Sequence, residues 1–458
     1  MSTTPTDVPS PAPAKTDAYA AFRFADYRSY AISGFVANLG RQMLGVALGY
    51  EIFQRTHSAT ALGLVGLMGA LPIIFLSIPA GITADRFGRK GIILATQLLT
   101  SLTSAGLTLL AVKHTVIPPL APLAAGTRSL YWLAGFFGEK GHVVFESALP
   151  VMYLLLFLNG IGRAFGWSAR SALFPNLVPR NALSNAVMWN SSTFELTCVV
   201  GPGLGGLAIA QFGVHAVYAI DAVCALAGFF FILPIHAPQA MAESHPHALR
   251  DLFTGLRFVR ENKIILAMIT LDLFAVLLGG SLALLPIFAD QILHVGAVGL
   301  GWLRAAPSLG AVLMALTLAH RPPLKKAGDT MLLAVAGFGI ATLVFGLSKN
   351  YALSFVALAL TGSCDNISVV VRHTLVQLLT PDPMRGRVSA VNNIFIGSSN
   401  ELGAFESGIT AALFGPIISV VGGGLGTILV VLATAWNWPQ VRTIGALQPP
   451  EKSAQCVD

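Results

Sequence analysis

Long apolar runs alternate with short polar segments along almost the whole chain. A helix that crosses the hydrocarbon core of a bilayer needs about 20 mostly apolar residues. The sequence has twelve such runs, at residues 29–53, 59–82, 91–112, 149–174, 184–212, 216–234, 264–289, 298–319, 330–347, 352–379, 388–415 and 417–436. The pattern predicts an all-α polytopic membrane protein with twelve transmembrane helices.

The polar segments between the runs predict the domain organisation. We expect cytoplasmic tails at residues 1–28, which is rich in Pro, Ser, Thr and Ala and predicted to be disordered, and at 439–458. Residues 113–147 form a long exterior loop whose apolar centre is too short to span the bilayer, so it is either an interfacial, lid-like element or an unstructured insertion. The longest interior loop, residues 235–263, divides six runs from six.

This interior loop contains an amphipathic pattern. Apolar side chains recur in it at helical spacing, namely Leu249, Leu252, Phe253, Leu256 and Val259. A helix of this kind lies on the cytoplasmic membrane surface or, equally, packs on the protein's own cytoplasmic face.

The two sets of six runs resemble each other. Three positions in the fourth run and its end match three in the tenth, with Gly160, Arg170 and Pro179 equivalent to Gly362, Arg372 and Pro381. Residues 192–196 likewise match 398–402. We therefore expect two pseudo-symmetric six-helix bundles, at 29–234 and 264–438, an architecture typical of transporters.

The composition excludes a soluble protein. Hydrophobic residues make up 54% of the chain and charged residues only 11%, against about 25% charged in soluble domains. The net charge of +7 does not indicate nucleic-acid binding here, because Lys and Arg concentrate in the predicted cytoplasmic segments. With both termini in the cytoplasm, few of these cations fall in the segments on the exterior side of the membrane: Arg55, Lys113, Arg128, Lys140 and Lys349.

Four carboxylates fall well inside the apolar runs: Glu195, Asp272, Asp365 and Glu401. An ionisable residue in a membrane segment is costly and therefore indicates a functional site. A carboxyl group that alternates between a wet cavity and a dry one can load and release a proton. We expect these four to be the candidates for proton coupling, the alternative being fixed ion pairs with intramembrane arginines that orient the helices.

Other polar residues inside the runs are candidates for the transport pathway or for ion pairs: Arg41, Arg163, Arg304, Arg372, Asn400 and Glu406. Arg170 and Arg372 lie at equivalent positions near the cytoplasmic ends of their runs, where their long side chains either pair or reach into the headgroups. Asn400 belongs to a markedly polar eleventh run, which lines the pathway or makes interhelical hydrogen bonds.

The sequence offers no sign of a cofactor or an enzyme. The four cysteines show neither a CxxC nor a Cys/His spacing for a metal. Nucleotide-binding and hydrolase motifs are also missing. We expect no metal, no cofactor and no catalytic residue.

A charged segment separates the second run from the third. It contains Gly81, Asp85, Arg86, Gly88, Arg89 and Lys90. We expect a tight loop at the water surface, because four of its ten residues are charged. The segment resembles the signature loop G-x-x-x-D-R-x-G-R-K of the major facilitator superfamily at every defined position, whereas its second-half counterpart, residues 321–329, is degenerate.

A second motif strengthens the resemblance. Gly201, Pro202, Gly205 and Gly206 fit the G-P-x-x-G-G motif of helix five in superfamily members that are proton antiporters, although Thr197 replaces the leading glycine. Residues 247–258, 384–392 and 399–408 resemble the bacterial subgroup of the enterobactin exporter and drug-efflux antiporters.

The resemblance implies a secondary transporter of the bacterial inner membrane that acts as a monomer. It implies proton-coupled efflux of small siderophore- or drug-like molecules by alternating access. The lipid bilayer, protons and the substrate are then its partners, and 81–90 is a cytoplasmic gate in which Asp85 pairs with a cation or a helix N-terminus. An importer or a non-transporting sensor of the same fold is the alternative.

Overall fold

The computed structural model of the chain describes residues 17–112, 121–138, 148–236, 248–322, 326–381 and 384–445. All secondary structure in these ranges is helical. The long helices of the first half are α1 (Ala25–Thr56), α2 (Ala59–Arg86), α3 (Arg89–Val112), α5 (Leu149–Leu173), α6 (Arg180–Phe212) and α7 (Val214–Ile232). Those of the second half are α9 (Lys263–Leu278), α11 (Gly296–Ala319), α12 (Ala327–Leu347), α13 (Tyr351–Leu379), α14 (Arg385–Phe414) and α15 (Pro416–Asn437).

Ten spans in the described part of the chain are long and apolar enough to cross a membrane. They agree closely with ten of the predicted runs. Helices α1 and α14 are also long enough to cross a membrane, with 32 and 30 residues. Their polar residues make them less apolar than the ten spans. The multi-pass membrane fold is confirmed, and the count of twelve stays a prediction.

One predicted helix is broken. The run at 264–289 was expected to be continuous, but α9 ends at Leu278 and the chain continues as η3 (Ser281–Leu284), α10 (Leu285–Ile287) and η4 (Phe288–Ile292). The break lies at Gly279 and Gly280, where other helices approach closely. A Cβ atom on Gly280 would lie 2.7 Å from the carbonyl oxygen of Gly403 on α14.

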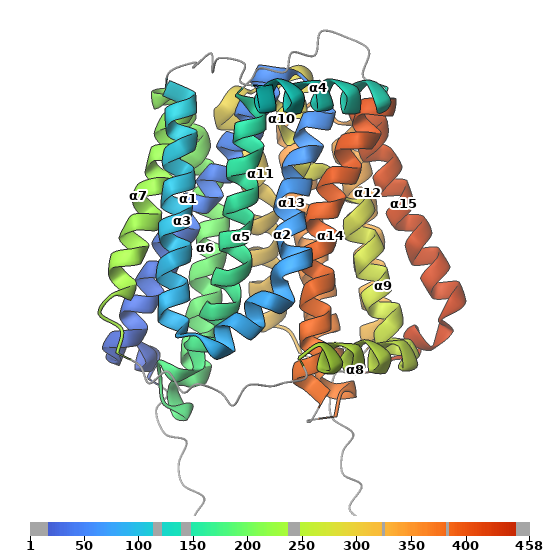
Figure 1. Cartoon of the computed structure of the whole chain (residues 1–458). Coiled ribbons are helices and arrows are strands. Elements are labelled where there is room, and N and C mark those ends of the chain that lie inside the picture. The colour runs from blue at the N-terminus through green and yellow to red at the C-terminus, as the bar shows by residue number, and fades with distance from the viewer. Residues whose placement is uncertain are drawn as a thin grey trace, which may run out of the picture.

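Two shorter helices lie across opposite ends of the long ones (Figure 1). Helix α4 (Ala121–Phe136) lies at one end, and α8 (Ala248–Glu261) lies at the other. We call these ends the α4 face and the α8 face. The α4 helix supports the interfacial reading of the 113–147 segment over an unstructured one, although 113–120 and 139–147 lie outside the described residues.

Helix α8 packs on the second half. A Cβ atom on Gly255 would lie 2.8 Å from the Arg387 carbonyl oxygen at the start of α14. Val259 is 2% exposed and belongs to a core of the second half. Phe253 and Leu256 are exposed. The amphipathic helix thus packs on the protein and also presents apolar side chains outward.

The predicted N-terminal tail is shorter than expected. Residues 20–28 were assigned to it, but η1 (Ala20–Arg23) and the first turn of α1 occupy this range. Ala21 and Tyr27 are fully buried, because they pack in a core of the first half. Residues 1–16 lie outside the described residues. At the other end, η6 (Pro439–Val441) packs beside α12 and is not a free tail.

The pseudo-symmetry inferred from the repeats has a structural counterpart. Gly160 of α5 faces Pro72 of α2, and Gly362 of α13 faces Pro307 of α11. Each equivalent glycine thus meets a proline inside the corresponding neighbouring helix. The duplicated positions keep the same packing role in both halves.

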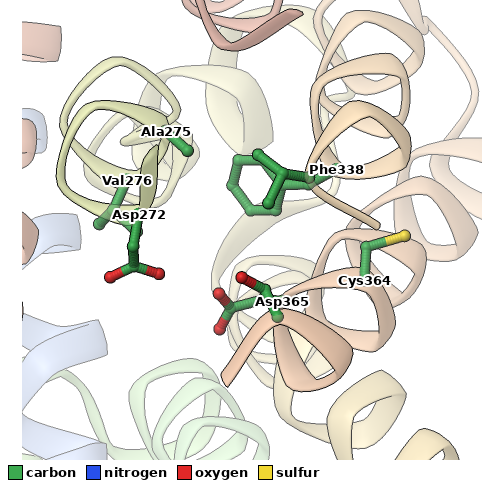
Figure 2. Close-up of a pocket in the computed structure, with 8 residues that line it drawn as sticks. Asp272, Ala275, Val276, Phe338, Cys364 and Asp365 are labelled. Carbon is green, nitrogen blue, oxygen red and sulfur yellow. The ribbon is translucent and has the colours of Figure 1, made fainter. Parts of the chain in front are cut away.

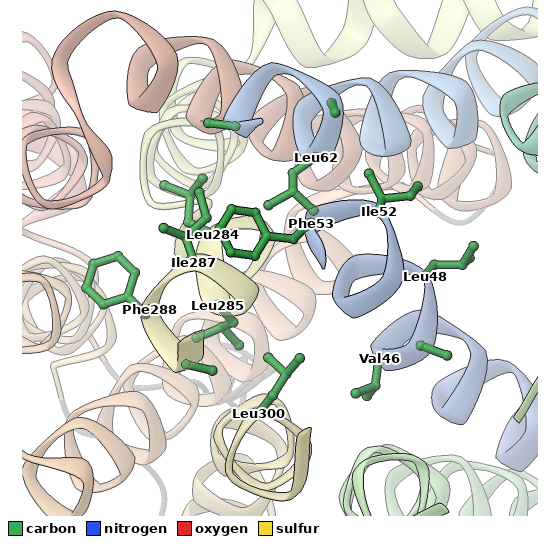
Figure 3. Packing of buried hydrophobic residues seen from close by; sticks show 14 of the residues in the cluster. Val46, Leu48, Ile52, Phe53, Leu62, Leu284, Leu285, Ile287, Phe288 and Leu300 are labelled. Atoms are coloured by element: carbon green, nitrogen blue, oxygen red, sulfur yellow. The ribbon is translucent and has the colours of Figure 1, made fainter. Parts of the chain in front are cut away.

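Three buried apolar clusters show how the halves meet. One cluster combines residues of both halves, including Phe53 and Leu62 of the first with Leu284 and Phe288 of the second (Figure 3). The other two clusters lie toward the α8 face, and each is confined to a single half. The halves therefore share a core toward the α4 face and have separate cores toward the α8 face.

Candidate functional site

Glycines let the halves approach at two helix pairs. On α2, Gly63, Gly66 and Gly69 recur every three residues and face α14. A Cβ atom added at Gly66 would lie 2.7 Å from the Cβ atom of Ala404 on α14. A side chain at any of these positions would separate the backbones. The interface between α2 and α14 is thus built from small residues on one helical face.

The helix-five motif forms the other contact. A Cβ atom on Gly206 of α6 would lie 2.5 Å from the Ala297 carbonyl oxygen and 3.1 Å from the Cα atom of Gly301, both on α11. Gly201 and Gly205 face α1 instead, and Pro202 is buried within α6. The motif thus lies between a helix of its own half and a helix of the other half.

An ion pair joins the halves near the middle of the long helices. Arg163 Nη2 of α5 donates to Glu401 Oε1 of α14 at 3.0 Å. The side chains are 38% and 22% exposed, so the pair is partly accessible to solvent. Gly69 leaves room beside it, because a Cβ atom there would lie 3.1 Å from Glu401 Oε2. The structure thus brings together two residues predicted separately from the sequence.

A second ion pair lies inside the second half. Arg372 of α13 pairs with Asp272 of α9, and the two side chains are only 2% and 10% exposed. Asp365 and Asp272 line a small cavity of about 10 Å³, where their carboxylates face the same space (Figure 2). That volume corresponds to about one water molecule. Arg372 therefore pairs within its own half in this conformation and not across the halves.

The remaining intramembrane candidates have separate environments. Glu195 of α6 is half-buried and makes no hydrogen bond or ion pair within the described part of the chain. Glu406 is also half-buried. Asn400 is exposed and donates to the Ile396 carbonyl of its own helix at 2.8 Å, and it has no interhelical hydrogen bond to any residue that the structure describes.

The segment 81–90 is mostly helical, which corrects the predicted loop. Helix α2 continues to Arg86 and α3 begins at Arg89, so only Phe87 and Gly88 lie outside helices. Gly88 does not have a positive φ. The link is sharp because two helices meet across two residues, and glycine's conformational freedom is not required. The side chain of Asp85 lies outside the described residues.

Two cations of this segment cap helix ends. Arg89 Nη1 donates to the Ala172 carbonyl at the end of α5 at 2.9 Å. Lys90 Nζ donates to the carbonyls of Leu233 and Ile235, just after α7, at 2.6 and 3.0 Å. The last carbonyls of a helix have no intrahelical donor, and a cation there is favourable. These two residues thus fasten three helices of the first half together.

We expect Lys90→Ala to destabilise the purified protein by about 1 kcal/mol, because it removes a charged cap from the end of α7. Arg86→Ala is the matched control, since Arg86 is exposed and makes no contact of this kind among the described residues. Thermal unfolding in detergent measures both. An equal melting temperature for the two variants would contradict the capping role.

Sequence reasoning missed one buried charged group. Glu51 is 6% exposed and accepts hydrogen bonds from Arg55 Nη2 at 2.6 Å and from the Tyr218 hydroxyl at 2.5 Å. Glu four residues before Arg on one helix is a recognisable pair. No sequence pattern indicates that Tyr218, on α7, would join this pair. The group fastens α1 to α7 near the α4 face.

The two bundles of long helices share an apolar core toward one face, and a charged pair joins them at mid-depth. This arrangement is typical of a membrane transporter. The sequence pattern of the Major Facilitator Superfamily matches residues 30–404. The chain belongs to this superfamily, and it is a transporter and not an enzyme.

Curated relatives include the enterobactin exporter EntS of Escherichia coli O1:K1 / APEC. It is 28% identical over 406 residues, which cover 88% of this chain and 89% of the relative. EntS of Shigella boydii serotype 18 shows the same identity and coverage.

Solved structures share the fold. A bacterial homologue of the human lysosomal transporter Spinster, in an inward-facing and occupied conformation, gives a TM-score of 0.66 at 13% identity, covering 92% of this chain and 98% of that one. The xylose transporter XylE of E. coli, in an inward open conformation, gives 0.60 at 13% identity, covering 90% and 94%.

Proposed function

We propose that the protein exports small organic molecules of the siderophore or drug type by proton-coupled alternating access. The observation that carries this proposal is the one-sided packing of the halves. They share an apolar core toward the α4 face and keep separate cores toward the α8 face. An alternating-access transporter requires two halves that can part at one face while they are closed at the other.

The distribution of cations supports an orientation with the α8 face in the cytoplasm. Cations are frequent at or near this face, where basic residues of membrane proteins concentrate. Arg86 ends α2, Lys90 lies in the first turn of α3 and Arg257 lies in α8. Both termini are then cytoplasmic, and we assign the described conformation, in which the halves keep separate cores at this face, to the state that opens toward the cytoplasm. We place the protein in the bacterial inner membrane as a monomer.

Glu401 is the strongest candidate for the proton site. Its ion pair with Arg163 connects the two halves, whereas Asp272 pairs with Arg372 inside one half. An ion pair requires an ionised carboxylate, so it breaks when Glu401 takes up a proton. Protonation from the α4 side would therefore accompany opening at that face, and release of the proton would accompany its closing. Glu195 and Asp365 remain secondary candidates.

The enterobactin exporters among the relatives support the direction and the class of substrate. The sequences align over 406 residues, so the likeness extends through both halves. Small organic molecules also fit a pathway between two helical bundles.

The test is dye transport by everted membrane vesicles with and without an imposed pH gradient. We expect gradient-dependent accumulation, and Glu401→Gln is expected to reduce the gradient-dependent rate about 10-fold, a typical size for energetic coupling between two sites. Glu261→Gln is the control, because Glu261 is exposed on α8 and pairs only with Arg257 in the described structure.

The outcomes separate the alternatives. Equal transport with and without the pH gradient would contradict proton coupling. Accumulation only in right-side-out vesicles would indicate an importer. Binding of the dye without any movement would indicate a sensor.

A further inference from the structure

Two arginines near the inter-half ion pair have no hydrogen-bond or ion-pair partner among the described residues. Arg41 lies midway along α1, and Arg304 lies in α11 of the other half. Neither makes a hydrogen bond or an ion pair with any residue that the structure describes. Arg41 is exposed and Arg304 is half-buried, so both guanidinium groups have accessible surface.

Arg304 lies against the helix that carries Arg41. A Cβ atom on Gly45 would lie 3.1 Å from Arg304 Nη2. Gly45 follows Arg41 by four residues on α1, so the two positions share a helical face and are about one turn apart. Gly45 thus leaves the space in which the Arg304 guanidinium lies, between the two halves and about one turn from the position of Arg41 on α1.

The charges around them do not balance. Arg41 lies within electrostatic range of Arg163 and Arg304 within range of Glu401, but Glu401 is already paired with Arg163. The carboxylate near Arg41 is Asp221, which is 1% exposed and accepts a hydrogen bond from Ser104 at 2.5 Å. The group therefore carries more positive than negative charge at the depth of the membrane.

Such an excess is costly unless a ligand completes it. Ionisable residues at membrane depth pair with opposite charges or line a pathway for ions or substrates. A guanidinium group offers several N–H donors in a planar fork that matches the oxygens of carboxylates and related anions. Two such groups from opposite halves can hold one anion and connect the halves through it.

We propose that Arg41 and Arg304 form a binding subsite for an organic anion, which gives the transported molecules a negative charge. The transport of such an anion rests on the function proposed above, whereas its binding does not. The subsite lies between α1 of the first half and α11 of the second, so its geometry changes when the halves move. Lipophilic cations are poor ligands for it, because they meet two like charges.

The test compares two dyes with the same ring system and opposite charge. Carboxyfluorescein is the anion and rhodamine 6G the cation, and fluorescence anisotropy measures their binding to the purified full-length protein. We expect the anion to bind at least about 10-fold more tightly than the cation. The cation cannot accept a charge-assisted hydrogen bond from a guanidinium group, and losing one such bond changes the affinity by about this factor. Arg41→Gln and Arg304→Gln are each expected to weaken anion binding by a similar factor.

The controls separate charge from folding. Arg304→Lys keeps the charge and is expected to retain most of the binding, and Arg257→Gln, on exposed α8, is expected to retain all of it. Size-exclusion chromatography checks that each variant is folded. Equal binding of both dyes, no binding of the anion, or unchanged anion binding in both glutamine variants would overturn the subsite.

A transport arm separates this inference from the proposed function. Proteoliposomes loaded with carboxyfluorescein are given a pH gradient, and release of the dye is measured. Binding that depends on the arginines without gradient-driven release would retain the subsite and reject the exporter. Release that persists in both Arg41→Gln and Arg304→Gln would retain the exporter and reject the subsite.

Discussion

Replacing Arg372 by alanine is expected to destabilise the protein by about 3–5 kcal/mol, the cost of leaving a buried charge without its partner. Arg372 and Asp272 are 2% and 10% exposed, so water cannot solvate the carboxylate that remains. The measurement is the thermal unfolding of the purified protein in detergent, together with the yield of folded protein from membranes.

A double variant provides the control. Asp272→Asn combined with Arg372→Gln removes both charges and keeps polar side chains of similar size, so it is expected to recover most of the loss. The single variants Asp272→Asn and Arg372→Gln complete a double-mutant cycle, which measures the interaction energy of the pair. A double variant as unstable as Arg372→Ala would show that the guanidinium stabilises α13 by other contacts.

Gly362→Val is expected to prevent close packing of α13 against α11 and to reduce the folded yield severely. A Cβ atom at Gly362 would overlap the backbone carbonyl of Pro307, and the backbone of a helix cannot move aside as a flexible side chain can. Overpacking of a core costs about 1–3 kcal/mol and occasionally more. The contact involves backbone, so we expect a value at or above the upper end of this range.

Gly422 is the matched control, since it also lies in a long helix, α15, and no atom from another part of the described structure lies within 4 Å of the position of its Cβ atom. Gly422→Val is expected to leave the folded yield unchanged. Fluorescence-detected size-exclusion chromatography compares the two. A similar loss for both variants would mean that the helical glycines matter for a reason other than close approach.

Hydropathy predicted the long helices well because a segment that crosses the hydrocarbon core must be about 20 residues long and mostly apolar. The break in α9 escaped it, since Gly279 and Gly280 interrupt the helix without a change in polarity. The segment 81–90 was predicted as a loop from its charges. Charged residues also occur in the last and first turns of helices at the membrane surface, where their side chains reach water or cap helix ends.

The pairing of charges could not be predicted from the sequence. The intramembrane carboxylates looked alike, yet Glu401 joins the halves while Asp272 pairs within one. Arg163 and Asp365 each follow a repeat glycine by three residues, so the duplication carries opposite charges at equivalent positions. Only the arrangement of the helices shows which group each one meets.

The packing of α8 determines where the protein can be divided. This helix follows the first half in the sequence, but Gly255 and Val259 pack on the second. A gene cut between the codons for residues 236 and 248 would therefore encode two polypeptides, each with its own α8-face core. They would have to find each other through the contacts between the halves, which include the shared apolar core, the Arg163–Glu401 pair and the glycine-lined helix pairs α2–α14 and α6–α11. Separate synthesis of the two pieces is thus a genetic way to ask how much of the assembly the covalent connection supplies.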